Sequence, residues 1–149
     1  MSKATLEKRI DGSFVTATPQ DAEVMQRLKI GDGVVVEFKV MRNYKFHKKY
    51  FALLNLAYES WETAEGAPEK NFQQFRDDIT ILSGHYIQVV RVDNSVRTIA
   101  KSVSFASMDA DEFERLYDKT CTVLINRILT TYTRPDIDRV INQISEFAT

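Results

Sequence analysis

Hydrophobic residues near the N-terminus occur in short runs separated by turn-forming residues, a pattern that predicts strands. Residues 4–10 and 13–17 read as two strands around residues 11–12, an Asp-Gly dipeptide that favours a hairpin turn. Residues 34–40 (VVVEFKV) are rich in β-branched side chains and follow a glycine break. They predict the clearest strand of the protein.

A helix-capping pattern lies between these strands. Thr18 is a good N-cap, Pro19 suits the first helical position, and Asp21 completes a pattern like a capping box. We therefore expect a short helix that begins here and ends near Lys29.

The strongest helical pattern begins at Asn43 or Tyr44. Its apolar residues recur at intervals of three and four, so they share one face of a helix. These residues are Phe46, Tyr50, Leu53, Leu54, Ala57 and Trp61. We expect this face to lie in the core.

The second half of the chain alternates between helical and strand patterns. Residues 71–82 predict a helix, and residues 86–92 and 96–105 predict a second hairpin. Cap residues at Asp109 and Thr133 each precede a helical pattern. The whole order predicts a single α+β domain over residues 1–149, with a mostly antiparallel sheet from two hairpins plus a central strand, packed against helices, and a C-terminal helical pair.

The composition limits the classes of protein to which this chain can belong. A chain of 149 residues that is 44% hydrophobic can bury a core as one domain. No apolar run approaches the ~20 residues that span a bilayer, and the N-terminus lacks a signal-peptide core. One cysteine and two histidines form neither an internal disulfide nor a standard zinc site. We expect a cytoplasmic protein without membrane contact, metal or cofactor.

Charge is distributed unevenly, although the formal net charge is only -1. Five cations and no acid lie between residues 39 and 49: Lys39, Arg42, Lys45, Lys48 and Lys49. Lysines at a helix N-terminus are unfavourable by ~0.3–1 kcal/mol each, because that end carries partial positive charge. Their position therefore favours a function such as phosphate binding, although a solvated basic helix start without a ligand is an equal alternative.

Aromatic residues interleave with these cations, which is typical of proteins that bind single-stranded nucleic acid. Tyr44 and Phe51 are candidates for stacking on bases, and the surrounding cations favour a neutral His47. Lys101 extends the patch if its strand pairs near residues 34–40. The candidate nucleic-acid-binding residues are Lys39, Arg42, Asn43, Tyr44, Lys45, His47, Lys48, Lys49 and Lys101.

Catalytic signatures are missing from the sequence, and we expect no enzyme and no catalytic residue. Asp77 and Asp78 read as the exposed side of a helix, and His85 as a structural or surface residue. Cys121 falls on an apolar stripe and reads as a buried small hydrophobe.

Several blocks of the sequence resemble a family of uncharacterised phage and prophage proteins. The resemblance covers nearly the whole chain. The blocks are residues 42–43 (RN), 46–55 (FHKKYFALLN), 69–72 (EKNF) with 75–76 (FR), and 101–106 (KSVSFA) with 108–109 (MD) and 112–113 (EF). The resemblance implies a phage gene product that works inside a bacterial cell, and it implies no particular activity.

The pair Arg42-Asn43 and the helix after it are also similar to the Orf (NinB) recombination-mediator family of lambdoid phages. That resemblance covers only this part of the chain. It implies a dimer that binds single-stranded DNA.

Two functions follow as alternatives. The first is a non-enzymatic nucleic-acid-binding accessory protein, with single-stranded DNA as the partner, in phage recombination or replication. The second is a phage antagonist of a host nuclease, defence or replication complex, in which acidic residues 77–78 and 109–112 mimic a nucleic acid. We expect a homodimer in either case, with apolar surface of the last two helices packed between protomers.

Overall fold

The computed structural model describes residues 2–147, and the side chains of residues 2–144. Its architecture is α+β, as the sequence predicts. The elements, in order, are β1 (Leu6–Lys8), β2 (Phe14–Thr16), α1 (Pro19–Met25), α2 (Tyr44–Ser60), α3 (Phe72–Leu82), β3 (Tyr86–Val90), β4 (Val96–Ala100), a 3-10 turn η1 (Phe105–Ser107), α4 (Ala110–Arg127) and α5 (Arg134–Phe147). The last two helices form the expected C-terminal pair.

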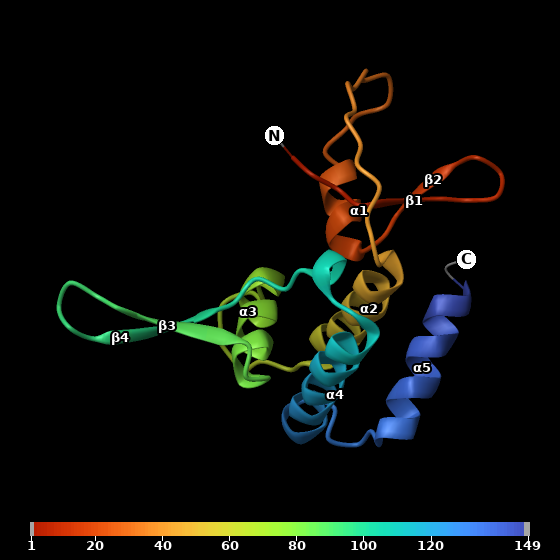
Figure 1. Ribbon diagram of the computed structural model, residues 1–149. Helices are drawn as coiled ribbons and strands as arrows, with labels where there is room; N and C mark the ends of the chain where they lie inside the picture. The colour runs from red at the N-terminus through yellow and green to blue at the C-terminus, as the bar shows by residue number, and fades with distance from the viewer. Residues whose placement is uncertain (1, 148–149) are drawn as a thin grey trace.

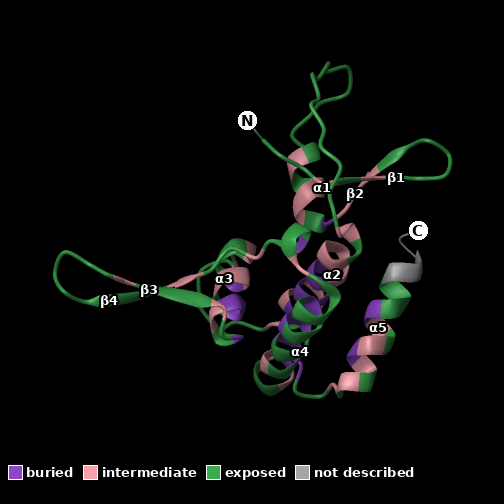
Figure 2. Cartoon of the chain, in the orientation of Figure 1, coloured by how far each residue is buried: buried purple, intermediate pink, exposed green. Residues whose placement is uncertain are grey.

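Helix α2 runs through the middle of a helical body, with α3, α4 and α5 packed around it (Figure 1). Four of the six residues predicted on its apolar face are buried: Tyr50, Leu53, Leu54 and Ala57, with Leu54 fully enclosed. Phe46 and Trp61 pack against the margin of the core and are partly exposed. Buried side chains concentrate in this helical body, and the projections from it are exposed (Figure 2). The main partners of α2 in the core are Phe75, Ile79, Phe113, Tyr117, Leu124, Ile137 and Ile141.

The two predicted hairpins project from this body as separate two-stranded ribbons (Figure 1). Their turns share the same pattern of hydrogen bonds. In the first turn, the Asp11 carboxylate accepts hydrogen bonds from the backbone amide of Ser13 at 2.9 Å and from its hydroxyl at 2.6 Å. Gly12 supplies the positive φ of 84° between them. Asp93 and Ser95 make the same two bonds in the second turn.

The strand predicted over residues 34–40 does not form. This segment lies outside any helix or strand and is exposed, in the loop between α1 and α2, which we call the α1–α2 loop (residues 26–42). A strand needs a hydrogen-bonded neighbour. However, β1 pairs with β2 and β3 with β4, so neither ribbon recruits the segment. The expected continuous sheet with a central strand was therefore wrong.

Several element boundaries also differ from the prediction, and two of the differences change where candidate or core residues lie. Helix α1 ends at Met25 instead of near Lys29. Strand β4 ends at Ala100, and Phe105 lies in η1, where its ring is buried in the core.

The predicted caps of the later helices are present. Asp109 accepts a hydrogen bond from the backbone amide of Glu112 at 2.8 Å at the start of α4. Thr133 and Asp136 bond reciprocally at the start of α5. Within the described residues, none of these helices combines the length and apolar character needed to cross a bilayer.

Candidate nucleic-acid interface

Asn43 joins the α1–α2 loop to α2 and has a structural role. Its φ of 55° is left-handed, a conformation that Asn tolerates better than most residues. Its side chain does not cap the helix. Instead, its Nδ2 donates hydrogen bonds to the carbonyl oxygens of Phe105 at 2.9 Å and Met108 at 3.0 Å. Because both amide hydrogens are engaged, the expected contact of Asn43 with nucleic acid is not supported by this geometry.

An acid from β1 approaches the basic start of α2. The hydroxyl of Tyr44 donates to Glu7 Oε2 at 2.8 Å, and Lys48 Nζ lies 3.3 Å from the same oxygen. The side chains of Lys48 and Glu7 are only 17% and 21% exposed. Burial and the bond to Glu7 raise the pKa of Tyr44. Two of the predicted site residues are thus held by a carboxylate inside the fold.

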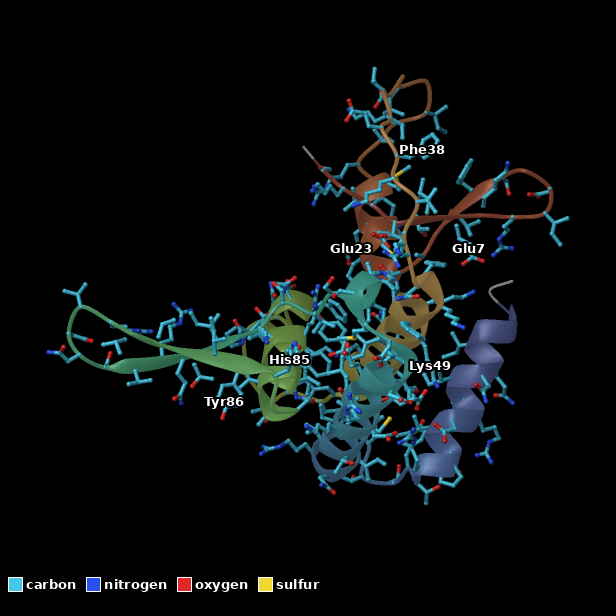
Figure 3. All side chains as sticks on the ribbon, in the orientation of Figure 1. Glu7, Glu23, Phe38, Lys49, His85 and Tyr86 are labelled. Carbon is cyan, nitrogen blue, oxygen red and sulfur yellow. The ribbon has the colours of Figure 1, made fainter. Side chains whose placement is uncertain are left out.

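Lys49 is also engaged within the helical body (Figure 3). Its Nζ lies 4.4 Å from the centre of the Tyr117 ring and 3.9 Å from Glu114 Oε1. A cation over an aromatic ring is stabilised by the negative face of the ring. Lys49 therefore bridges α2 and α4.

His47 packs among aromatic rings. Its ring stacks on Phe51 at 4.5 Å and meets the edge of Phe105 at 5.8 Å. Burial lowers the pKa of His47, and Arg76 lowers it further, whereas Asp21 opposes the shift. The neutral ring was predicted, but its main cause is burial and not the neighbouring lysines. Phe51 itself is buried, so it is not available for stacking on a base.

Three cations of the predicted cluster remain exposed: Lys39, Arg42 and Lys45. No ion pair of these residues occurs within the described part of the chain. They lie on both sides of Asn43, where the loop enters α2, and the first turn of α2 contains no acid. This junction is the part of the predicted site that presents free positive charge.

Lys101 was expected to extend the patch if its strand paired near residues 34–40. That pairing does not form, since β4 pairs only with β3. Instead, the backbone amide of Lys101 donates to the carbonyl of His85 at 3.1 Å, at the base of the β3–β4 ribbon. Strand pairing therefore does not bring Lys101 next to the basic residues at the start of α2.

The α1–α2 loop contributes two further cations that the sequence interpretation missed. Arg27 and Lys29 were assigned to a helix, but α1 ends before them and both are exposed in the loop. The loop holds four cations and two acids, Asp32 and Glu37. A correct helix boundary at Met25 would have revealed this second group of cations.

The structure also accounts for the residues that were considered as metal-binding or catalytic candidates. Asp77 and Asp78 each accept a hydrogen bond from a glutamine one turn earlier on the exposed side of α3. Cys121 is buried, as predicted, and burial raises the pKa of its thiol to about 11. No group of three potential metal ligands occurs among residues whose positions are described.

Comparison with known proteins identifies a family. The family model described as "Protein of unknown function (DUF1367)" matches residues 1–71 and 63–147. No curated protein and no solved structure matches the chain significantly. Because the two matched regions together cover nearly all of the sequence, the chain belongs to the DUF1367 family, a family of unknown function.

Proposed function

We propose that the protein is a non-enzymatic nucleic-acid-binding accessory protein that engages single-stranded DNA in phage recombination or replication, inside a bacterial host cell. The observation that carries this proposal is the junction of the α1–α2 loop with α2. Lys39, Arg42 and Lys45 are exposed there, and no acid lies in the first helical turn. The phage context rests on the sequence resemblance described above.

The helix start adds a second attraction for phosphate. The first amides of a helix have no partner within it, and the helix dipole places partial positive charge at this end. At the start of α2, the backbone amide of Phe46 is the first that donates within the helical turn, and its acceptor is the carbonyl oxygen of Asn43. An incoming phosphate group would satisfy the free amides and offset the repulsion among the cations.

The internal ion pairs indicate which cations of the cluster are available to bind phosphate. Lys48 and Lys49 face Glu7 and Glu114, so their charges are already partly compensated. Lys39, Arg42 and Lys45 should therefore provide most of the affinity for phosphate. The proposal can therefore be tested by comparing substitutions of the exposed cations with substitutions of the paired cations in the same cluster.

The test is fluorescence anisotropy with a labelled oligo(dT) over a series of salt concentrations. Three phosphate contacts give a slope of log affinity against log salt of about −2, at ~0.7 per phosphate for a single strand. The triple variant K39A/R42A/K45A should lose this slope, since it removes the exposed charges. The matched control K48A/K49A should keep most of it.

The outcome separates two functions. Equal binding by the parent and K39A/R42A/K45A contradicts the proposed site. A parent that binds neither single-stranded DNA, duplex DNA nor RNA at low salt contradicts the proposed function. It would leave the protein antagonist as the better proposal, which the exposed acidic start of α4 favours: Asp109, Asp111, Glu112 and Glu114.

A further inference from the structure

The α1–α2 loop contains an apolar segment that one copy of the protein leaves uncovered. We call residues 34–41 the arm. Four of its side chains, at alternate positions, are 53 to 90% exposed: Val34, Val36, Phe38 and Val40. Single exposed hydrophobic residues are common, but a run of this kind usually marks an interaction site. Figure 3 shows Phe38 on this projecting loop, away from the helical body.

The arm has the two-sided pattern of a half-buried strand. Side chains point to alternate sides of an extended chain. One side of the arm is therefore fully apolar, and the other carries Val35, Glu37, Lys39 and Met41. This period of two is typical of a strand with one face on a core and one face in solvent. The arm thus has a strand sequence but lacks a neighbouring strand.

The β3–β4 ribbon is the matching incomplete element. A two-stranded ribbon is at best marginally stable alone, and its outer edges carry unpaired backbone groups. The register pairs Tyr86 with Ala100, Gln88 with Thr98 and Val90 with Val96, so these side chains share one face. Tyr86, Val90 and Val96 are 45 to 72% exposed on it. Since β4 is the strand that packs beside α3, the outer edge of β3 is the more open one.

We propose that the arm of one copy adds as a strand to the outer edge of β3 in a second copy, and that the exchange is reciprocal. Addition of an extended segment to an open sheet edge gives backbone hydrogen bonds, and alternate side chains provide specificity. The apolar side of the arm would continue the face of Tyr86 and Val90. Glu37 and Lys39 would then lie on the side that carries Arg91 and Arg97, and Glu37 would complement the charge of the two arginines.

A second copy fits better than the arm's own ribbon. The loop leaves one end of the molecule and the β3–β4 ribbon leaves its side, in different directions (Figure 1). The apolar faces of α4 and α5, which suggested a helical dimer interface, are largely buried within a single chain. The arm and the ribbon carry much of the uncovered apolar surface among the described residues, and reciprocal exchange closes a two-fold dimer.

This inference is independent of the proposed nucleic-acid function. Lys39 points to the charged side of the arm, and Arg42 and Lys45 lie beyond the arm. The assembly can therefore be measured without nucleic acid.

Two adjacent substitutions of identical chemistry test the pairing. V36D places a charge on the apolar side of the arm, and V35D places the same charge on the opposite side. Both positions are exposed in one copy, so both variants should fold. Sedimentation equilibrium should show a dimer for the parent, a dimer Kd raised at least tenfold for V36D, and a change of less than about threefold for V35D.

Complementation distinguishes arm-to-ribbon exchange from other interfaces. V90D disables the ribbon, so V90D alone should raise the dimer Kd at least tenfold, as V36D alone should. A mixture of the two should form heterodimers, because the intact arm of V90D can pair with the intact ribbon of V36D. A monomeric parent at tens of micromolar, a dimer Kd for V36D or V90D close to that of the parent, or a mixture that associates no better than either variant alone would each overturn the proposal.

Discussion

At the scale of single residues, Asn43 shows how a position inside a basic cluster can serve the fold. Its left-handed backbone turns the chain into α2, and its side chain ties this turn to Phe105 and Met108. Asn43→Ala should cost about 2–4 kcal/mol, from two lost hydrogen bonds and the strain of a left-handed alanine. Asn43→Gly should cost about 1–2 kcal/mol less, because glycine adopts this φ freely. Urea unfolding measures both, and equal losses would show that backbone strain is unimportant here.

His47 gives a pH dependence whose sign follows from its burial. Its pKa is lowered in the folded state, so below about pH 6.5 the unfolded chain takes up a proton that the folded chain does not. The free energy of unfolding should therefore fall as the pH drops from about 7, until the lowered pKa is reached. His47→Phe should reduce this dependence, as measured by urea unfolding between about pH 7 and pH 5. His85→Gln is the control, and an identical dependence in H47F and the parent would contradict the assignment.

At the scale of elements, the contact between β1 and α2 limits the available positive charge. Glu7→Gln removes the negative charge beside Lys48 but keeps an oxygen that can accept from Tyr44. If the proposed function is correct, this variant should bind oligo(dT) more tightly, with a salt slope steeper by about 0.7, because one more cation meets phosphate. Glu23→Gln makes the same charge change on the exposed surface of α1, and a similar gain there would indicate a general effect of net charge.

The sequence predicted the elements whose causes are local. The capping residues at Asp21, Asp109 and Asp136 and the Asp-x-Ser turns act within three residues, so their patterns were sufficient. The arm was misjudged because strand formation depends on a neighbour that local sequence does not reveal. Similarly, the acid that engages Lys48 lies 41 positions away in the chain, at Glu7. The exposure of Lys39, Arg42 and Lys45 was compatible with the prediction. However, only the fold distinguishes these three cations from Lys48 and Lys49, whose charges are partly compensated by acids.

At the scale of the whole molecule, positive charge collects on two of the three projections, whereas the β1–β2 ribbon (residues 6–16) carries two cations and two acids. The α1–α2 loop has two more cations than acids, and so does the segment 85–101 that contains the β3–β4 ribbon. The net charge of the chain is -1, so the remainder, mainly the helical body, is negative. A polyanion should therefore be attracted to the α1–α2 loop and the β3–β4 ribbon and repelled by the body, which orients the encounter before any specific contact forms.

The packing of α5 against α2 has a consequence during protein synthesis. The two helices are neighbours in the fold, but 87 residues separate the end of α2 at Ser60 from the end of α5 at Phe147. At ~5–20 residues per second, a ribosome needs roughly 4–17 s to make that stretch. During this interval the side of α2 that α5 will cover is open to water and to chaperones. Folding of the body is therefore completed only after α5 has been made.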